Sequence, residues 1–152
     1  MAKDLSSTNA ATYKDATAYQ LLYLIEVDAD VPGGSTTTLR YGTRKYTLPS
    51  TSVTYDDKLR EGGMSLGWHQ ARIGGGLAEV AGFSYVLANE GQESVTLSDD
   101  YFLENDAVRV YLIFVSGSEA AVDKIEVARG VIENYPFSMR DFSFDVIDGS
   151  DK

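Results

Sequence analysis

The residues that could carry chemistry in this sequence are few and scattered. His69 is the sole histidine, and there is no cysteine. A transition-metal site needs several nitrogen or sulfur ligands, so we expect no such site. Serine and aspartate are abundant, so composition alone leaves a Ser-His-Asp triad open, but no Gly-x-Ser-x-Gly elbow is present. We interpret His69, which follows Trp68 in a candidate strand, as a structural or surface residue.

Carboxylates are plentiful, but they do not form a recognisable catalytic pair. A glycosidase needs two carboxyl groups placed across a cleft. The neighbouring carboxylates of this chain all fall in predicted loops: Asp56 with Asp57, Asp99 with Asp100, and Glu104 with Asp106. We interpret them as a solvated acidic surface.

Two further motifs fail on their spacing. Asp28 and Asp30 resemble half of a calcium loop, but Val31 and Pro32 break the EF-hand pattern, which leaves an adventitious calcium site as the alternative. The glycines at residues 74–76 are not followed by Lys-Ser or Lys-Thr, so they do not form a phosphate loop. We therefore predict no enzyme activity, no cofactor and no metal site.

The overall charge narrows the class of partner. The chain has 23 acidic and 13 basic side chains, a net charge of -10 and an isoelectric point near 4.4. Nucleic-acid binders usually present a basic face, so we expect no direct sequence-specific binding of nucleic acid. An anionic membrane surface is disfavoured for the same reason. No apolar run approaches the roughly 20 residues of a membrane span, and the first residues lack an apolar signal region, so we expect no Sec export.

Alternation of apolar and polar residues indicates strands along most of the chain. The clearest case is the stretch 106–116, in which every second residue is apolar: Val108, Val110, Leu112 and Phe114. Ile113 and Val115 make the end of this stretch apolar on both sides. The pattern predicts a central strand that begins half-buried and ends buried on both faces. Residues 124–133 and 137–147 follow it, and we predict an antiparallel three-strand meander.

Shorter strands precede this meander. We expect them at residues 18–28, 36–40, 46–48 and 53–55, with turns at 31–35 and at Gly42, and a charged loop over 56–63. Residues 64–73 and 77–87 read as a hairpin across the three glycines. Ser98 is placed to cap a short helix over 98–105. Short strands with frequent turn residues predict an all-β fold, an antiparallel β-barrel or sandwich, with one short helix.

The domain organisation is simple. A chain of 152 residues with 43% hydrophobic residues predicts one globular domain, which we place at residues 18–152. Residues 1–17 are polar and read as a flexible N-terminal arm, or as an arm that orders against a neighbouring subunit.

The order of these elements resembles a known family. A strand over 19–28 leads to Tyr-Gly-Thr-Arg-Lys-Tyr at residues 41–46, then to Gly62, Gly63 and Leu66, then to Val-Arg-Val-Tyr at 108–111, and finally to a strand containing Gly130. This resembles the hub-barrel domains of tailed-bacteriophage tail-tip and baseplate proteins. The resemblance implies a virion structural protein that assembles in the host cytoplasm. It implies a homo-oligomeric ring of three or six copies that joins the tail tube to other tail proteins, without catalysis. The negative charge would suit a lumen through which DNA must slide.

The candidate contacts between subunits are polar and lie in predicted turns and loops. They comprise the one basic spot and part of the charged loop: Arg40, Arg44, Lys45, Asp56, Asp57, Lys58 and Arg60. Two alternatives from other classes stay open. Trp68 and the many tyrosines would suit a carbohydrate-binding module of a tail fibre or secreted protein, and a small β-barrel enzyme acting on polysaccharide is the third reading.

Overall fold

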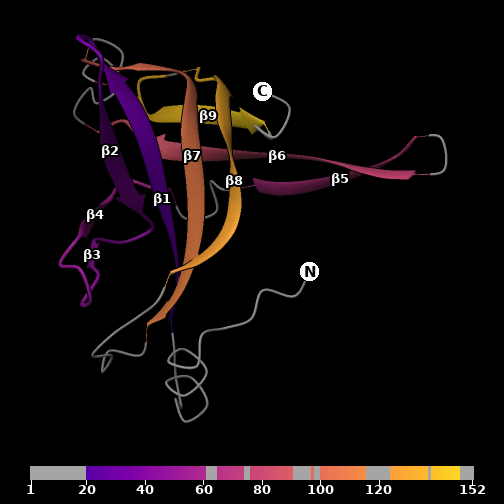
Figure 1. Ribbon diagram of the computed structural model, residues 1–152. Coiled ribbons are helices and arrows are strands. Elements are labelled where there is room, and N and C mark those ends of the chain that lie inside the picture. Colours follow the sequence, from indigo (N-terminus) through magenta and orange to yellow (C-terminus); the bar gives the residue numbers. More distant parts are fainter. Residues whose placement is uncertain are drawn as a thin grey trace.

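The computed structural model describes residues 20–60, 65–73, 76–90, 97, 100–115, 124–136 and 138–147. Of residues 66–73 and 76–81 it describes the backbone alone, and the predicted arm at residues 1–17 lies outside the described residues. The strands, labelled in Figure 1, are β1 Gln20–Val31, β2 Ser35–Gly42, β3 Tyr46–Thr47, β4 Thr54–Asp57, β5 Ser65–Ile73, β6 Gly76–Ala88, β7 Phe102–Val115, β8 Ile125–Asn134 and β9 Asp141–Ile147. The predicted all-β fold is confirmed.

The strands form one sheet that curls into a barrel. Their order is β3-β4-β2-β1-β7-β8-β9-β6-β5, and all pairs are antiparallel except β2 with β4. Residues 58–60, which follow β4, close the barrel between β2 and β6, and we call this join the seam. Leu59 forms a β-bridge with Leu87 of β6, and the Leu59 amide donates to the Gly42 carbonyl of β2 at 3.1 Å. The Arg60 amide donates to Val86 O at 2.9 Å, and the Ala88 amide donates to Lys58 O at 2.7 Å. The edges of β2 and β6 are thereby paired.

The β5–β6 hairpin leaves the barrel. Strand β6 pairs with β9 only from Phe83 to Ala88, whereas it pairs with β5 from Gly76 to Ser84. Figure 1 shows β5 and the adjoining half of β6 extending sideways from the barrel as a two-stranded arm. The hairpin predicted across the glycines is therefore confirmed, and no other described strand pairs with the second edge of β5.

The meander is also confirmed. Strand β7 is the longest strand, and it pairs with β1 on one side and β8 on the other, while β8 pairs with β9. The turn between β1 and β2 has positive φ at Gly33 (116°) and Gly34 (88°), as the Pro-Gly-Gly sequence predicts.

Several predicted boundaries are wrong. The helix expected over 98–105 is wrong over residues 102–105; residues 98 and 99 lie outside the described residues, and the Tyr101 amide donates to Leu97 O at 3.1 Å. From Phe102 onward the chain is β7, because Phe102 pairs with Asp30. The last strand begins at Asp141 rather than residue 137, because Ser138 closes a turn through its hydroxyl, which accepts from the Asp141 amide at 3.1 Å.

The segments around Gly42 and residues 56–63 also differ from expectation. Gly42 is the buried last residue of β2 and not a turn, since a Cβ there would lie 2.7 Å from Arg44 O. Asp56 and Asp57 belong to β4, and Leu59 is buried in the seam of the barrel. The expected charged loop is therefore part of the barrel wall up to Arg60, while residues 61–64 lie outside the described residues.

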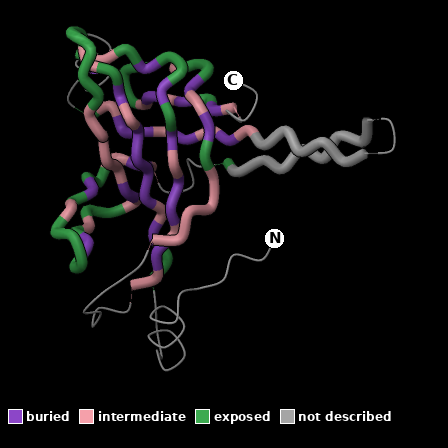
Figure 2. The backbone as a smooth tube through the Cα atoms, viewed as in Figure 1, coloured by how far each residue is buried: buried purple, intermediate pink, exposed green. Residues whose placement is uncertain are grey.

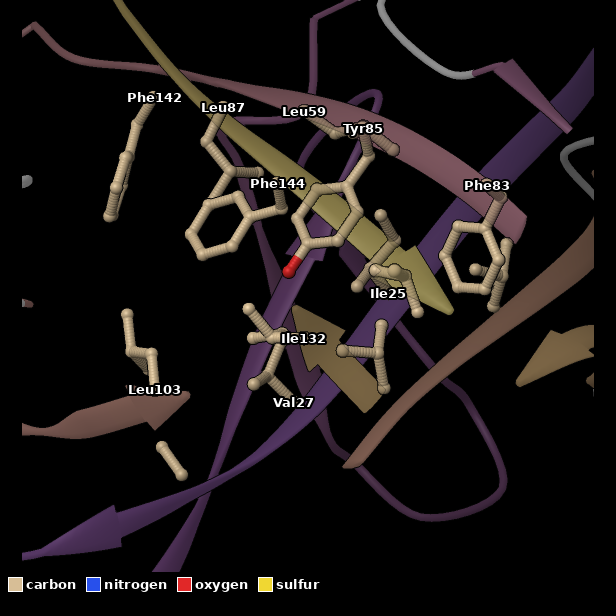
Figure 3. Close-up of a cluster of buried hydrophobic side chains, with 14 of the residues drawn as sticks. Ile25, Val27, Leu59, Phe83, Tyr85, Leu87, Leu103, Ile132, Phe142 and Phe144 are labelled. Atoms are coloured by element: carbon tan, nitrogen blue, oxygen red, sulfur yellow. The ribbon is translucent and has the colours of Figure 1, made fainter. Parts of the chain in front are cut away.

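An inner cluster of buried side chains fills the barrel. It comprises Ile25, Val27, Ala29, Leu59, Phe83, Tyr85, Leu87, Leu97, Leu103, Val108, Val110, Ile132, Phe142, Phe144 and Val146. Figure 3 shows aromatic rings at its centre, where Tyr85 stacks on Phe144 with ring centroids 4.6 Å apart. Full burial of each large apolar side chain is worth roughly 1.5–3 kcal/mol, so this cluster is the main stabilising feature.

A second, outer cluster covers the opposite face of β1 and β7. It consists of Leu22, Leu24, Leu48, Tyr55, Tyr111 and Ile113. Leu24 to Val27 of β1 and Val110 with Tyr111 of β7 are buried in succession, because both faces of the sheet are covered there, and these stretches are purple in Figure 2. Strands β3 and β4 and the turn between them cover this outer cluster, to which they contribute Leu48 and Tyr55. The prediction that β7 ends buried on both faces is wrong in part, because Ile113 is buried but Leu112, Phe114 and Val115 are only partly buried, and both faces are buried instead at Val110 and Tyr111.

Candidate interaction surface

The polar side chains of interest lie on the outer face of β1, β2 and β7. Side chains alternate along a strand, so Glu26 and Asp28 share the face that Leu22 and Leu24 occupy. Register places Glu26 opposite Arg40 of β2 and opposite Arg109 of β7. A row of alternating charge thus crosses three neighbouring strands where the outer cluster ends.

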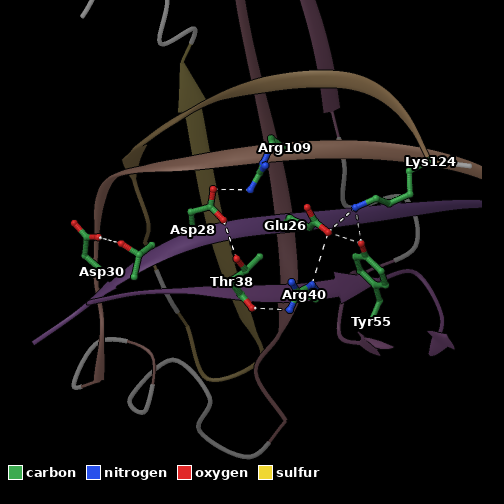
Figure 4. Close-up of polar contacts among 9 residues, drawn as sticks. Glu26, Asp28, Asp30, Thr38, Arg40, Tyr55, Arg109 and Lys124 are labelled. Atoms are coloured by element: carbon green, nitrogen blue, oxygen red, sulfur yellow. Dashed lines mark hydrogen bonds and ion pairs between the residues drawn. The ribbon is translucent and has the colours of Figure 1, made fainter. Parts of the chain in front are cut away.

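Glu26 is the centre of this row. Only 6% of it is exposed, and it receives hydrogen bonds from the Tyr55 hydroxyl (2.5 Å) and Lys124 Nζ (2.7 Å), as Figure 4 shows. Lys124 also donates to the Tyr55 hydroxyl oxygen at 3.0 Å and sits 4.1 Å from the centroid of the Tyr111 ring. Arg40 Nε lies 3.7 Å from the Glu26 carboxylate. A buried carboxylate is tolerable because these donors replace its lost water.

The electrostatics agree with this geometry. Burial by itself would raise the pKa of Glu26, but hydrogen bonds from Lys124 and Tyr55 and the attraction of Lys124 and Arg109 outweigh it, so the pKa lies below its ordinary value. The Tyr55 pKa is raised by burial and by the adjacent Glu26 carboxylate. The site therefore holds an ionised glutamate and a neutral tyrosine that donates to it.

Asp28 continues the row one step along β1. Its carboxylate is 2.5 Å from Arg109 Nη2 and accepts a hydrogen bond from the Thr38 hydroxyl at 3.0 Å (Figure 4). Asp30, two residues further, accepts from the Thr36 hydroxyl at 3.1 Å. The carboxylates of Asp28 and Asp30 are thus already hydrogen-bonded to side chains of β2 and, for Asp28, of β7. Within the described residues no group of three or more metal-ligating side chains is placed to hold an ion.

Asp106 is a second buried carboxyl, at the other end of the β1–β7 pair. The register shifts between Asp28 and Asp30, and Asn105 next to Asp106 has a φ of 68°, so the chain forms an irregular bulge there. Asp106 is 6% exposed and accepts one hydrogen bond from the Asp30 amide at 3.2 Å. Burial raises its pKa to about 6, the amide opposes this, and the Asp30 and Asp28 carboxylates add to it.

A groove of about 480 Å³ opens beside Glu26, between the outer face of the barrel and the segment that connects β3 to β4. Its lining combines charge, hydroxyl groups and apolar surface: Glu26, Arg40, Leu48, Ser50, Thr51, Val53, Tyr55, Tyr111 and Lys124. Two cationic side chains and one carboxylate meet here. This composition suits a polar ligand or a polar partner surface.

The seven contact residues predicted from the sequence do not form one cluster. Arg40 lies in the charged row, whereas Arg44 is exposed and donates to the Gln20 side chain at 3.2 Å. Lys45, Asp56 and Asp57 are exposed, and Lys58 is partly buried in the seam. Their role as subunit contacts stays a prediction.

Arg60 has a structural task in addition. Its Nε donates to Asp141 Oδ1 at 3.1 Å and its Nη2 donates to Arg140 O at 3.3 Å, so it ties the seam to β9. A further ion pair joins Arg60 to Glu90 at 3.6 Å. Substitution of Arg60 would therefore disturb the barrel as well as any contact.

Sequence reasoning missed Glu26, Tyr55 and Lys124 as a site, and it considered Asp28 only as half of a calcium loop. One signal was available, since a charged residue at 26 falls on the same face as Leu22 and Leu24. Trp68 and His69 pair with Ala81 and Val80 in the hairpin, but their side chains lie outside the description, so a sugar-stacking role is untested. Among the described residues, no helix has the length and apolar character needed to cross a bilayer.

Comparison with known proteins informs the fold. No protein-family profile and no curated protein matches the sequence. Seven chains of solved structures match. One belongs to the virion of a native gene transfer agent particle, with 14% sequence identity and a TM-score of 0.56. The alignment covers 91% of this chain and 44% of that chain, so this chain spans less than half the length of its match. The likeness is one of fold.

Proposed function

We propose that this chain is a structural protein of a phage-like virion, located in the tail, that assembles into a ring of three or six copies and joins the tail tube to distal tail proteins. The observation that carries the proposal is the barrel, which a chain of a gene transfer agent virion shares over 91% of this sequence. The proposed role requires contact surfaces, and it requires no catalysis.

The projecting hairpin supports the proposal. An isolated two-stranded hairpin is marginally stable in water. In the part of the chain that the structure describes, residues 76–82 of β6 pair only with β5, and β5 has no second neighbour in the sheet. The hairpin sequence includes Leu66, Trp68 and Leu77. A neighbouring subunit or another tail protein that packs against this arm would supply the missing partner.

The test is the mass and location of the native protein. The full chain is purified and its mass is measured by size-exclusion chromatography with light scattering over a wide concentration range, followed by negative-stain imaging. We expect a mass of three or six copies and ring-shaped particles. Mass spectrometry of purified virions should find the protein. A chain that stays monomeric at every concentration and is missing from virions would refute the proposal.

A further inference from the structure

We infer that the groove beside Glu26 is one half of a contact between two copies of this chain, in which Arg40 binds exposed carboxylates at Glu133 and Asp145 of the next copy. The inference rests on the proposed self-assembly and names the two surfaces that would meet. It follows from unused hydrogen-bond donors of Arg40 on one side of the barrel and from the exposed carboxylates of Glu133 and Asp145 on another side.

Arg40 has donors to spare. Its Nη1 donates to Thr38 O at 3.3 Å, and its Nε is buried at 3.7 Å from Glu26, so Nε faces the barrel and not a partner. Among the described residues Nη2 makes no hydrogen bond, and it is the donor left for an incoming group. A guanidinium has five N–H donors in a fork that matches a carboxylate. The Arg40 side chain is 35% exposed at the groove, so an incoming group can reach it.

The charge of the groove is positive within an acidic chain. Arg40 and Lys124 share the single carboxylate of Glu26, which leaves one positive charge at the groove, while the whole chain carries -10. Lys124 is engaged by Glu26, Tyr55 and the Tyr111 ring. Arg40 is therefore the cation with free capacity. Ser50 and Thr51 line the same groove and add hydroxyl donors.

The acidic counterpart lies on another side of the barrel. Strands β8 and β9 stand two and three places from β1 in the sheet order. The register shifts between Ile132 and Asn134, which leaves Glu133 without an opposite residue on β9, and Asn134 pairs with Asp145. Glu133 and Asp145 are both exposed, and within the described residues neither makes a side-chain hydrogen bond or ion pair.

Two complementary patches on different sides of one molecule give a heterologous contact. Such contacts repeat from copy to copy and close into a ring when the rotation permits. Opposite charge at a rim fixes register between partners and speeds their encounter. A patch that bound its own twin would instead need self-complementary charge, which neither the groove nor the acidic pair offers alone.

The test uses the purified full chain, with self-association measured by sedimentation velocity at two salt concentrations. Asp145→Lys and Arg40→Gln are each expected to weaken association about tenfold or more, and salt is expected to weaken the wild type. Arg40→Gln is chosen because a glutamate beside Glu26 would threaten folding. Arg140→Glu, which changes charge at an exposed turn, is the matched control and should associate like the wild type. Urea unfolding confirms that each variant is folded.

A double-mutant cycle completes the test. The double variant Arg40→Gln, Asp145→Lys should weaken association by less than the two single effects combined, because each single variant already removes the same ion pair. If wild type assembles while Arg40→Gln and Asp145→Lys assemble equally well, the contact is refuted and the proposed function survives. Strictly additive effects of the two substitutions would also refute the pairing. A wild type that never associates would overturn the contact and the proposed assembly together.

Discussion

Replacing Asp106 by asparagine should stabilise the protein at neutral and alkaline pH. The carboxyl is buried in the β1–β7 bulge with one amide donor, and its pKa is raised from 3.8 to about 6 by burial and by the Asp30 and Asp28 carboxylates. Asparagine keeps an acceptor for the Asp30 amide and removes the buried charge. The perturbation therefore isolates the cost of ionising this one group.

The sign and size follow from proton binding. Between pH 3.8 and about 6 the folded state holds the Asp106 proton more tightly than the unfolded chain, so the free energy of unfolding falls as the pH rises through this window. The folded pKa lies about two units above the unfolded one, and each unit corresponds to about 1.4 kcal/mol. The stabilisation of Asp106→Asn over wild type should grow from near zero at pH 3 to about 3 kcal/mol at pH 8.

The assay is urea unfolding of both proteins at pH values from 3 to 8, at a concentration where each is monomeric. Subtracting the two curves removes the contribution of every other carboxyl group. Asp57→Asn, an exposed aspartate on β4, is the matched control, because it removes the same charge without the buried bulge. A wild-type minus variant difference that stays flat across this pH range would show that Asp106 is not a costly buried carboxylate.

Three further predictions concern packing and the charged row. A Cβ on Gly130 would lie 2.2 Å from a carbonyl oxygen of β9, so Gly130→Ala should lower the free energy of unfolding by about 3 kcal/mol. Gly82→Ala is the control and should cost far less, because the nearest atom to its Cβ is 3.4 Å away. Equal urea midpoints for the two variants would contradict this. Lys124→Met should lower the free energy of unfolding by roughly 3–5 kcal/mol, because it removes the ion-pair partner of the buried Glu26 carboxylate. In a double-mutant cycle, adding Glu26→Gln should recover part of this loss. The buried Tyr85 hydroxyl has no hydrogen-bond partner among the described residues, so Tyr85→Phe should be neutral or stabilising by up to about 1 kcal/mol. Clear destabilisation would reveal a partner such as a bound water.

The strands were predictable where a local pattern decides the outcome. Alternating apolar residues at 108–115 predict β7, and Pro-Gly-Gly at 32–34 predicts the β1–β2 turn, because both depend on neighbouring residues alone. The segment 102–105 was misassigned for the opposite reason. Its local signals favour a helix start after Ser98, but Phe102 pairs with Asp30, and that long-range pairing overrides local preference.

The site was beyond the reach of pattern reasoning. Alternation places Glu26 on the outer face, yet its partners Tyr55 and Lys124 are 29 and 98 residues away in sequence. Only the barrel brings these three segments together. Gly130 could be identified as unusual for a strand, but the close approach of the β9 backbone that demands it depends on how β8 pairs with β9, where the register shifts after Ile132.

The pairing of β1 with β7 has a consequence for synthesis of the chain on the ribosome. Gln20 pairs with Val115 and Asp30 with Phe102, so one whole edge of β1 waits for a strand that is translated after most of the chain. Such long-range pairing slows folding, and the nascent β1–β2 hairpin exposes an unpaired edge and apolar side chains until β7 leaves the exit tunnel. Stalled or prematurely terminated chains that end before residue 102 should therefore aggregate or depend on chaperones.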